Sequence, residues 1–240
     1  MKKLKTGAEK LGIYLSDDQS AAFEVYYKEL ITWNKRVNLT AITDYEEVQL
    51  KHFLDSLTLV KACNFKGRVE ELKVIDIGTG AGLPGIPLKI VFPKIRLTLL
   101  EATAKKTKFL ENLVSILGMK DVEIVTGRAE DIARFTQYRE KYDMVLSRAV
   151  ALLPALAELT IPFAVIGGIV VAQKKGDIDE EIGSAGKAIE ILGGWMKEVK
   201  QIEMEGLDDD RRLVIIEKIK ETPEKYPRRP GRPEKRPIQG

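Results

Sequence analysis

The sequence predicts a Rossmann-like α/β fold, in which a mostly parallel sheet follows a small helical region and ends in an antiparallel hairpin. Three observations predict it. Between residues 73 and 172, short apolar runs alternate with helical stretches, as in parallel strands joined by crossover helices. The first run leads into a glycine-rich turn. The last two runs of the chain have no helix between them, which argues against two symmetrical mononucleotide-binding halves.

Length and composition fit one α/β domain with short additions. The chain has 240 residues, of which 44% are hydrophobic and 31% are charged, as in ordinary globular proteins. We divide it into a helical region (1–66), a ligand-binding α/β domain (67–221) and a basic, proline-rich tail (222–240). No apolar run approaches the roughly 18 residues that span a membrane. One cysteine and one histidine exclude an internal disulfide and make a metal site unlikely, so we expect a cytoplasmic protein without a metal.

The first sixty residues have helical periodicity. Ser16, followed by two aspartates, is a typical helix start. Aromatic and apolar residues then recur at three- and four-residue steps, at Phe23, Tyr26, Tyr27, Leu30 and Trp33. Asn38–Thr43 breaks this helix. Asp44 and Glu47 have the spacing of a capping box, which predicts a second helix that runs toward Cys63.

The strands of the domain are predicted from short apolar runs. Five runs are typical of buried parallel strands: Val74–Ile77, Leu97–Leu100, Val122–Val125, Met144–Leu146 and Ile169–Ala172. The clearest helix between them is Lys105–Leu117, which Gly118 ends. Trp195–Glu205 and Leu213–Ile219 are joined by an acidic turn and form the closing hairpin.

The glycine turn after the first strand indicates a nucleotide pocket. Gly78, Gly80 and Gly82 follow the strand, and Glu101 ends the next strand, twenty-three residues after Gly78. Glycines let the backbone approach a ligand, and an acid at about this distance accepts hydrogen bonds from ribose hydroxyls. The order differs from the G-x-G-x-x-G pattern of dinucleotide sites, and Asp76 lies just before the turn.

A negative charge beside this turn favours a cationic ligand. Asp76 is a poor neighbour for a pyrophosphate and a good one for an amine or a sulfonium, and S-adenosylmethionine (SAM) carries both. The motif and the hairpin together predict a class I SAM-dependent methyltransferase, with 67–221 as its SAM-binding domain. A NAD-dependent oxidoreductase on the same sheet is the alternative, against which the glycine spacing and the lack of a separate substrate domain argue.

The candidate donor contacts lie at the carboxyl ends of the strands, where such sheets bind ligands. They are Asp76, Gly78, Gly80, Gly82, Leu83, Glu101, Ala102, Thr103, Ala129, Glu130 and Arg148. We assign Glu101 to the ribose, Ala129 and Glu130 to the adenine, and Arg148 to the methyl-bearing end, where it can meet a carboxylate or an RNA phosphate. Helix capping, a helix start and a surface ion pair are the structural alternatives for Glu101, Glu130 and Arg148.

Missing motifs narrow the methyl acceptor. Ser147-Arg-Ala-Val follows the fourth strand, where exocyclic adenine methylation usually needs Asn/Asp-Pro-Pro-aromatic. Cys63 precedes the first strand, which makes it a poor nucleophile for methylation at a pyrimidine carbon. The only histidine, His52, lies in the helical region, so no general base is evident. Guanine N7 already carries a lone pair, and its methylation needs positioning rather than proton abstraction.

The tail is the most basic part of the chain. Residues 222–240 contain six basic and two acidic residues, and five of the ten prolines. Such a segment cannot form a long helix, and we expect an extended backbone whose charges contact RNA phosphates. A disordered, solubilising tail is the alternative.

Several motifs together resemble one bacterial family, RsmG or GidB, over nearly the entire chain. They are Trp33–Thr40, Lys51–Ser56, Asp76–Gly85, Gly127–Glu130, Ser147–Val150 and Tyr226–Gly231. The resemblance implies donor contacts from Gly78, Leu83, Glu101, Ala129, Glu130 and Arg148. Leu83 replaces the phenylalanine often found there. The resemblance also implies that Trp33–Thr40, His52–Ser56 and the tail approach RNA.

The resemblance implies a SAM-dependent enzyme that forms N7-methylguanine in the decoding-region loop of 16S rRNA. The expected partner is 16S rRNA or the 30S particle, and we expect a monomer with no catalytic residue apart from Arg148 as a candidate. Our candidate RNA contacts are Lys35, Arg36, Arg148, Lys174, Lys175, Arg228, Arg229 and Arg232. A non-catalytic, SAM-responsive RNA-binding assembly factor is a further alternative.

Overall fold

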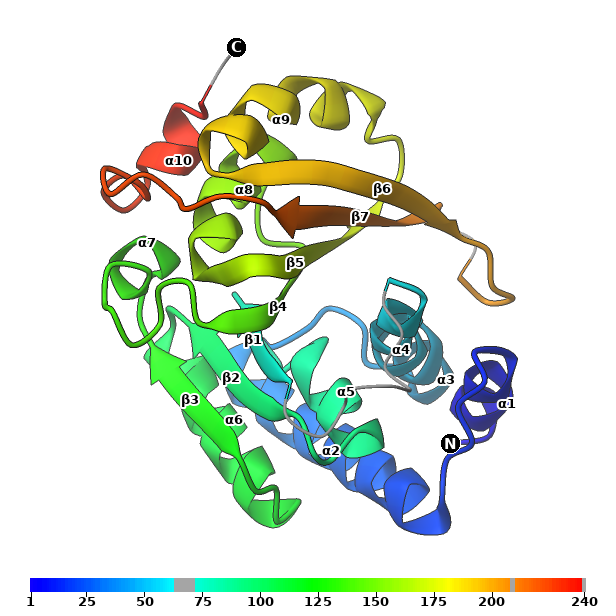
Figure 1. Ribbon diagram of the computed structural model, residues 1–240. Coiled ribbons are helices and arrows are strands. Elements are labelled where there is room, and N and C mark those ends of the chain that lie inside the picture. The colour runs from blue at the N-terminus through cyan, green and yellow to red at the C-terminus, as the bar shows by residue number, and fades with distance from the viewer. Residues whose placement is uncertain (63–71, 208–209, 239–240) are drawn as a thin grey trace.

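A seven-stranded sheet forms the centre of the computed structural model, which describes residues 1–62, 72–207 and 210–238 (Figure 1). The strands are β1 (Lys73–Ile77), β2 (Arg96–Glu101), β3 (Val122–Thr126), β4 (Tyr142–Arg148), β5 (Ala164–Lys175), β6 (Gly194–Ile202) and β7 (Arg211–Lys218). Their order is β3-β2-β1-β4-β5-β7-β6. Strands β1 to β5 pair in parallel, and β7 pairs antiparallel with both β5 and β6. The predicted fold class is confirmed, hairpin included.

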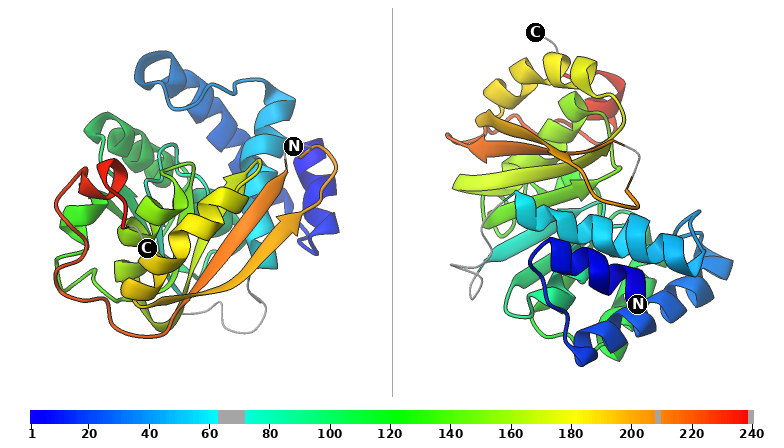
Figure 2. Two further views of the ribbon diagram at one scale, coloured as in Figure 1. Left: turned by 90° about the horizontal axis from the view of Figure 1, so that it is seen from above. Right: turned by 90° about the vertical axis from the view of Figure 1, so that its right-hand side faces the viewer.

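Helices cover both faces of the sheet. The α-helices are α1 (Lys2–Lys10), α2 (Asp17–Val37), α3 (Tyr45–Val48), α4 (Asp55–Leu57), α5 (Gly85–Val91), α6 (Ala104–Ile116), α7 (Ala129–Ile132), α8 (Leu153–Thr160), α9 (Asp179–Ile191) and α10 (Arg232–Lys235). A π-helical turn, η1 (Gln49–Leu54), and two 3₁₀ turns, η2 (Thr58–Lys61) and η3 (Ile161–Phe163), complete the elements. Figure 2 shows the N-terminal helices on one side of the sheet and α9 on the other.

Two apolar cores follow from this layering. The first joins the N-terminal helices to the sheet, since Phe23, Tyr26 and Phe53 share it with Val74 and Leu146. The second lies between the opposite face of the sheet and helices α8 and α9. The N-terminal helices therefore pack directly on the sheet.

The two predicted helix starts, at Ser16 and Asp44, are capped in different ways. Ser16 accepts the backbone N–H of Gln19, whose side chain accepts the N–H of Ser16, so the first helix has a complete capping box. Asp44 accepts two backbone N–H groups at the second start. The predicted reciprocal role of Glu47 is wrong, because its carboxylate pairs with Lys51 one turn later, at 2.5 Å.

The second helical segment differs from the single helix that was predicted. It passes through α3, η1, α4 and η2 instead of one continuous α-helix. Its π-helical turn carries His52, and such turns often occur at functional sites. Cys63 and the predicted loop Asn64–Glu71 lie outside the described residues.

The tail has a defined conformation through residue 238, which contradicts the disordered alternative. It contains the short helix α10 and buries Thr222, Pro233 and Ile238. The expectation of a fully extended backbone is also wrong. Hydrogen bonds to Glu130 of α7, to Arg139 and to Glu158 of α8 hold this segment in place.

Candidate functional site

The glycine turn lies at the topological switch point, where β1 has β2 on one side and β4 on the other. Gly78 and Gly82 both have positive φ, of 68° and 87°. A Cβ at Gly78 would lie 2.7 Å from Cγ2 of Val150, and one at Gly82 would lie 2.4 Å from Cδ1 of Ile86. Backbone conformation and space therefore both require glycine at these positions.

Glu101 and Asp76 hold the turn from two sides. The Glu101 carboxylate accepts the backbone N–H of Gly80 at 3.0 Å and that of Thr103 at 2.8 Å. Oδ2 of Asp76 accepts the Thr79 hydroxyl at 2.6 Å and the N–H of Gly85 at 2.9 Å. Both acids thus fix the backbone that was predicted to contact the donor.

Burial makes the charge of Asp76 costly. The side chain is fully buried, which raises its pKa to about 6, although the hydrogen bonds from Thr79 and Gly85 oppose the shift. Oδ1 of Asp76 has no hydrogen-bond partner among the described residues.

Three buried polar atoms of this kind lie near the carboxyl ends of β1, β4 and β5. Besides Asp76, they belong to Ser147 and Gln173, which lie at the carboxyl ends of β4 and β5. In register, Ser147 pairs with Ile77 of β1, and Gln173 pairs with Arg148 of β4. A buried polar group without a partner costs about 1–3 kcal/mol, and such groups at the carboxyl ends of parallel strands are typical of a ligand site.

Arg148 is anchored by the N-terminal region. Its Nη1 lies 3.0 Å from Oδ2 of Asp55 and 3.3 Å from the carbonyl oxygen of Lys51. Nη1 of Arg211, on β7, lies 2.9 Å from the same Asp55 oxygen. Gln173 donates to the Asp55 carbonyl oxygen at 2.7 Å. Asp55 thus joins the N-terminal region to β4 and β7 through its carboxylate and to β5 through its carbonyl oxygen.

His52 lies beside these arginines in a neutral state. Its Nε2 is 2.7 Å from the Thr40 hydroxyl. Burial and the positive charges of Arg148 and Arg211 lower its pKa to about 4. The segments around Thr40 and His52, separate in sequence, therefore meet near the end of β4.

The other predicted donor contacts occupy different environments. Ala102 and Thr103 are exposed beyond β2, whereas Leu83 is buried in the apolar core. Ala129 lies at the start of α7, next to Glu130, which is buried. Oε1 of Glu130 accepts the N–H of Gly231 at 2.8 Å and lies 3.2 Å from Nη2 of Arg128.

The predicted RNA contacts fall into two groups. Five are exposed: Lys35, Arg36, Lys175, Arg229 and Arg232. Three are engaged within the protein: Arg148 by Asp55, Lys174 by Glu181 at 2.6 Å and Arg228 by Glu158 at 2.6 Å. An arginine or lysine held by a carboxylate has fewer donors left for a phosphate, so the exposed group is the better candidate for RNA.

Comparison with known proteins identifies the family. The family model described as GidB, rRNA small subunit methyltransferase G, matches residues 19–214. The chain belongs to this family. A ribosomal RNA small subunit methyltransferase G of Dehalococcoides mccartyi is 52% identical over 99% of this chain and 100% of its own length, and one of Alkaliphilus metalliredigens is 46% identical over 98% and 97%. The resemblance predicted from the motifs is confirmed.

Solved structures agree on the fold of this GidB-family protein. A SAM-dependent methyltransferase of Aquifex aeolicus superposes with a TM-score of 0.52 at 17% identity, over 72% of this chain and 93% of its own. A precorrin-6y C5,15-methyltransferase of Geobacter metallireducens gives 0.51 at 18%, over 69% and 87%. At such identities the likeness concerns the fold alone.

The residues at the switch point fit SAM. The turn leaves no room for side chains at Gly78 and Gly82, and the buried carboxylate of Asp76 beneath it favours a cationic ligand over a pyrophosphate. Within the described ranges, no group of three or more His, Cys, Asp or Glu side chains could hold a metal ion. None of the described helices is long and apolar enough to cross a membrane.

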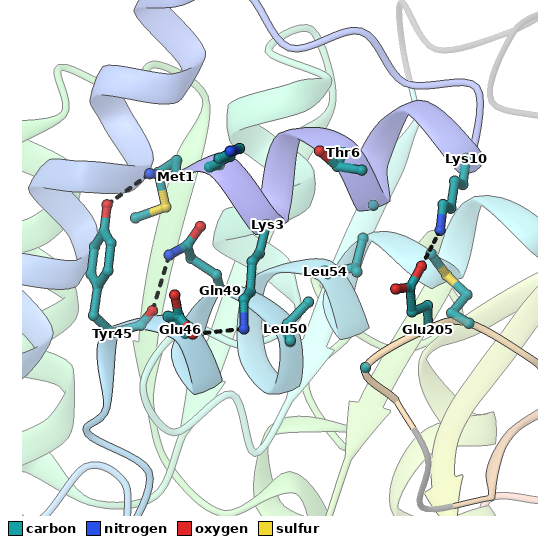
Figure 3. Close-up of a pocket in the computed structure, with 14 residues that line it drawn as sticks. Met1, Lys3, Thr6, Lys10, Tyr45, Glu46, Gln49, Leu50, Leu54 and Glu205 are labelled. Carbon is teal, nitrogen blue, oxygen red and sulfur yellow. Dashed lines mark hydrogen bonds and ion pairs between the residues drawn. The ribbon is translucent and has the colours of Figure 1, made fainter.

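A separate pocket of about 550 Å³ lies between α1, η1 and the β6–β7 connection (Figure 3). Its apolar lining includes Leu50 and Leu54, and ion pairs cross its rim from Lys3 to Glu46 and from Lys10 to Glu205, each at 2.6 Å. These ion pairs tie α1 to the rest of the molecule.

The site also contains residues that sequence reasoning missed. Asp55 lies within the Lys51–Ser56 motif, so the sequence marked it as a candidate, but the sequence did not show that it pairs with Arg148. Arg211 and Gln173 carried no motif, and only the sheet order brings them to Asp55. Tyr26, predicted as an apolar-face residue, also donates its hydroxyl to the carbonyl oxygen of Ala81 in the glycine turn, at 2.5 Å.

Proposed function

We propose that this protein transfers a methyl group from SAM to N7 of a guanine in the decoding-region loop of 16S rRNA, with the RNA or the 30S particle as substrate. The observation that carries the proposal is the glycine turn at the switch point, held by Asp76 and Glu101, in a chain of the small-subunit rRNA methyltransferase family. SAM supplies a methyl group activated by its positively charged sulfur. The protein is proposed to act in the cytoplasm.

The donor side rests on the glycine turn. The glycines at 78 and 80 let the backbone approach the ligand, and we assign the ribose to Glu101, which already accepts the N–H of Gly80. Carboxylate oxygens accept more than one hydrogen bond, so Glu101 can serve the turn and the ribose together. Ala129 and Glu130 lie at the adenine end, and Arg148 lies at the opposite end.

The acceptor side favours an atom that needs no deprotonation. His52 is the single histidine of the chain, and its lowered pKa makes it a weak base whose Nε2 is already engaged by Thr40. Guanine N7 presents a lone pair in the plane of the ring. Its methylation requires the donor and the base to be held in line, for which positioning is sufficient.

The RNA side rests on exposed cations from distant parts of the chain. Lys35 and Arg36 end helix α2, and Lys175 ends β5. Arg229 and Arg232 lie in the C-terminal segment. Such residues contact phosphates without reading sequence and position the target loop.

A methyl-transfer assay tests the proposal. Purified protein is incubated with tritiated SAM and 30S particles from cells that lack the gene, and nucleoside mass spectrometry then identifies the modified base. We expect label in 16S rRNA as N7-methylguanine, and less of it with a Glu101→Ala variant when SAM is limiting. SAM binding without label transfer would favour the assembly-factor alternative. Binding of NADH in place of SAM would favour the oxidoreductase.

A further inference from the structure

The C-terminal strap, residues 222–238, closes one side of the pocket at the adenine end of the donor site. Figure 1 shows it as the orange-to-red segment that runs past α7 and α8 to α10. It is fixed at intervals along its length. Arg139 donates to the carbonyl oxygens of Thr222 and Tyr226, at 2.7 and 2.9 Å.

The strongest anchor of the strap is an ion pair with a fully buried acid. Glu158, on α8, is 0% exposed. Its carboxylate accepts three hydrogen bonds from Arg228: from Nη2 at 2.6 Å, from Nε at 3.0 Å and from the backbone N–H at 2.6 Å. Such a paired, fork-like contact fixes orientation as well as distance. The strap therefore has one defined position relative to α8.

A second anchor lies inside the donor site itself. The N–H of Gly231 donates to Glu130, one of the two residues assigned to the adenine. Immediately after it, α10 brings Glu234 to the rim of a small pocket of about 70 Å³. The strap thus contributes to the same pocket as the ends of β1 and β2 and the start of α7.

The lining of this pocket suits a flat, mostly apolar ring with one polar edge. Its apolar walls are Ile77, Leu100, Val150 and Leu159, and its charged groups are Arg128, Glu130 and Glu234. Arg128 is drawn toward the two acids, with Nη2 3.2 Å from Glu130 and 3.8 Å from Glu234. Oε1 of Glu130 is occupied by Gly231 and Arg128, whereas the Glu234 side chain is about half exposed, at 49%.

We propose that Glu234 is a specificity-determining residue of the donor site. Its carboxylate accepts a hydrogen bond from the exocyclic amine of adenine. The proposal rests on the proposed use of SAM. An ionised carboxylate only accepts hydrogen bonds. It therefore selects a ring with an amine at its edge and repels a ring with a carbonyl oxygen there, because two acceptors would then face each other. A site built to pair a polar group discriminates strongly against an analogue that lacks it.

The test compares two ligands that differ only at this edge. Calorimetry measures the dissociation constants of S-adenosylhomocysteine and of S-inosylhomocysteine, in which a carbonyl oxygen replaces the amine, for the wild-type protein and for Glu234→Gln. The glutamine amide donates as well as accepts, so it can pair with the carbonyl oxygen. We expect the wild type to prefer the adenosyl ligand by about tenfold or more. The preference should fall by about tenfold in Glu234→Gln.

Glu224→Gln is the matched control, because Glu224 is an exposed acid of the same strap and is not part of the pocket lining. It should keep the wild-type preference. Unchanged preference in Glu234→Gln, with both ligands still bound, would overturn the role of Glu234 and leave the proposed function intact. Failure of the folded wild type to bind S-adenosylhomocysteine would instead overturn the proposed function, and this inference with it.

Discussion

The guanidinium of Arg148 lies 3.0 Å from the buried carboxylate of Asp55, which joins the end of β4 to the N-terminal helices. Asp55 is 1% exposed. This contact sets the position of the arginine expected at the methyl-bearing end of the donor. Two of the predicted motifs, Lys51–Ser56 and Ser147–Val150, therefore form one unit.

Replacing Asp55 should damage both stability and catalysis. In Asp55→Asn the charge that Arg148 and Arg211 share is lost, and breaking a buried pair of this kind costs roughly 3 kcal/mol. Misplacement of a positioning group by about 1 Å can lower the rate by about a hundredfold, so we expect methyl transfer to fall by that order. Urea unfolding and single-turnover assays measure the two effects. Glu9→Gln, at an exposed position of α1, is the control, and wild-type activity in Asp55→Asn would contradict the prediction.

Removing the Glu101 side chain should weaken SAM binding. Glu101→Ala loses the hydrogen bonds to the N–H groups of Gly80 and Thr103 as well as the expected ribose contact. We expect SAM affinity to fall by about tenfold or more, which corresponds to about 1.4 kcal/mol. Calorimetry measures it directly. An unchanged dissociation constant would remove Glu101 from the donor site.

The single histidine permits a direct test of the environment at Arg148. Because the pKa of His52 is about 4 in the folded protein and its ordinary value is 6.5, the folded protein binds fewer protons than the unfolded chain between these values. Stability should therefore be highest above pH 6.5 and should decline by up to about 1.4 kcal/mol per pH unit as the pH falls toward 4. NMR of the His52 ring, in protein without a histidine tag, should show a midpoint near 4. A midpoint at 6 or above would contradict the proposed burial beside two arginines.

Exposed arginines of the strap should contribute to RNA affinity without affecting the donor. Each phosphate contact changes the slope of log affinity against log salt concentration by about 0.7 to 0.9. A double variant, Arg229→Ala with Arg232→Ala, should therefore have a slope that is shallower by about 1 to 2 units. SAM affinity should stay at the wild-type value. Lys187→Ala with Lys197→Ala, on α9 and β6, is the control pair. Deleting the whole strap is a poorer test, because it would leave the buried Glu158 without Arg228.

The sheet and its glycine turn could be predicted because their signals are local. Each predicted strand run lies within an observed strand or overlaps most of it, and helix α6 begins and ends within one residue of the predicted range. Buried parallel strands read as short apolar runs, and positive φ at Gly78 and Gly82 requires glycine. The position of Glu101 at the end of β2 was predictable for the same reason, since its distance from Gly78 follows from one strand–helix–strand unit.

The remainder depended on contacts between distant segments. Composition gave the tail its basic and proline-rich character and suggested an extended or disordered segment. Its conformation instead depends on Glu158, an acid with no sequence signal, which is buried only because α8 packs on the sheet. Likewise, Arg211 reaches Asp55 only because β7 inserts between β5 and β6. Periodicity does not encode strand order.

The hydrogen bond from Tyr26 to Ala81 spans 55 residues, and that from Gly231 to Glu130 spans 101. Closing such long stretches of chain costs conformational entropy, which the contacts of the folded state must offset. A molecule that binds SAM has brought together segments from residue 26 to residue 231, so donor binding would report on completed folding and would stabilise that state by mass action.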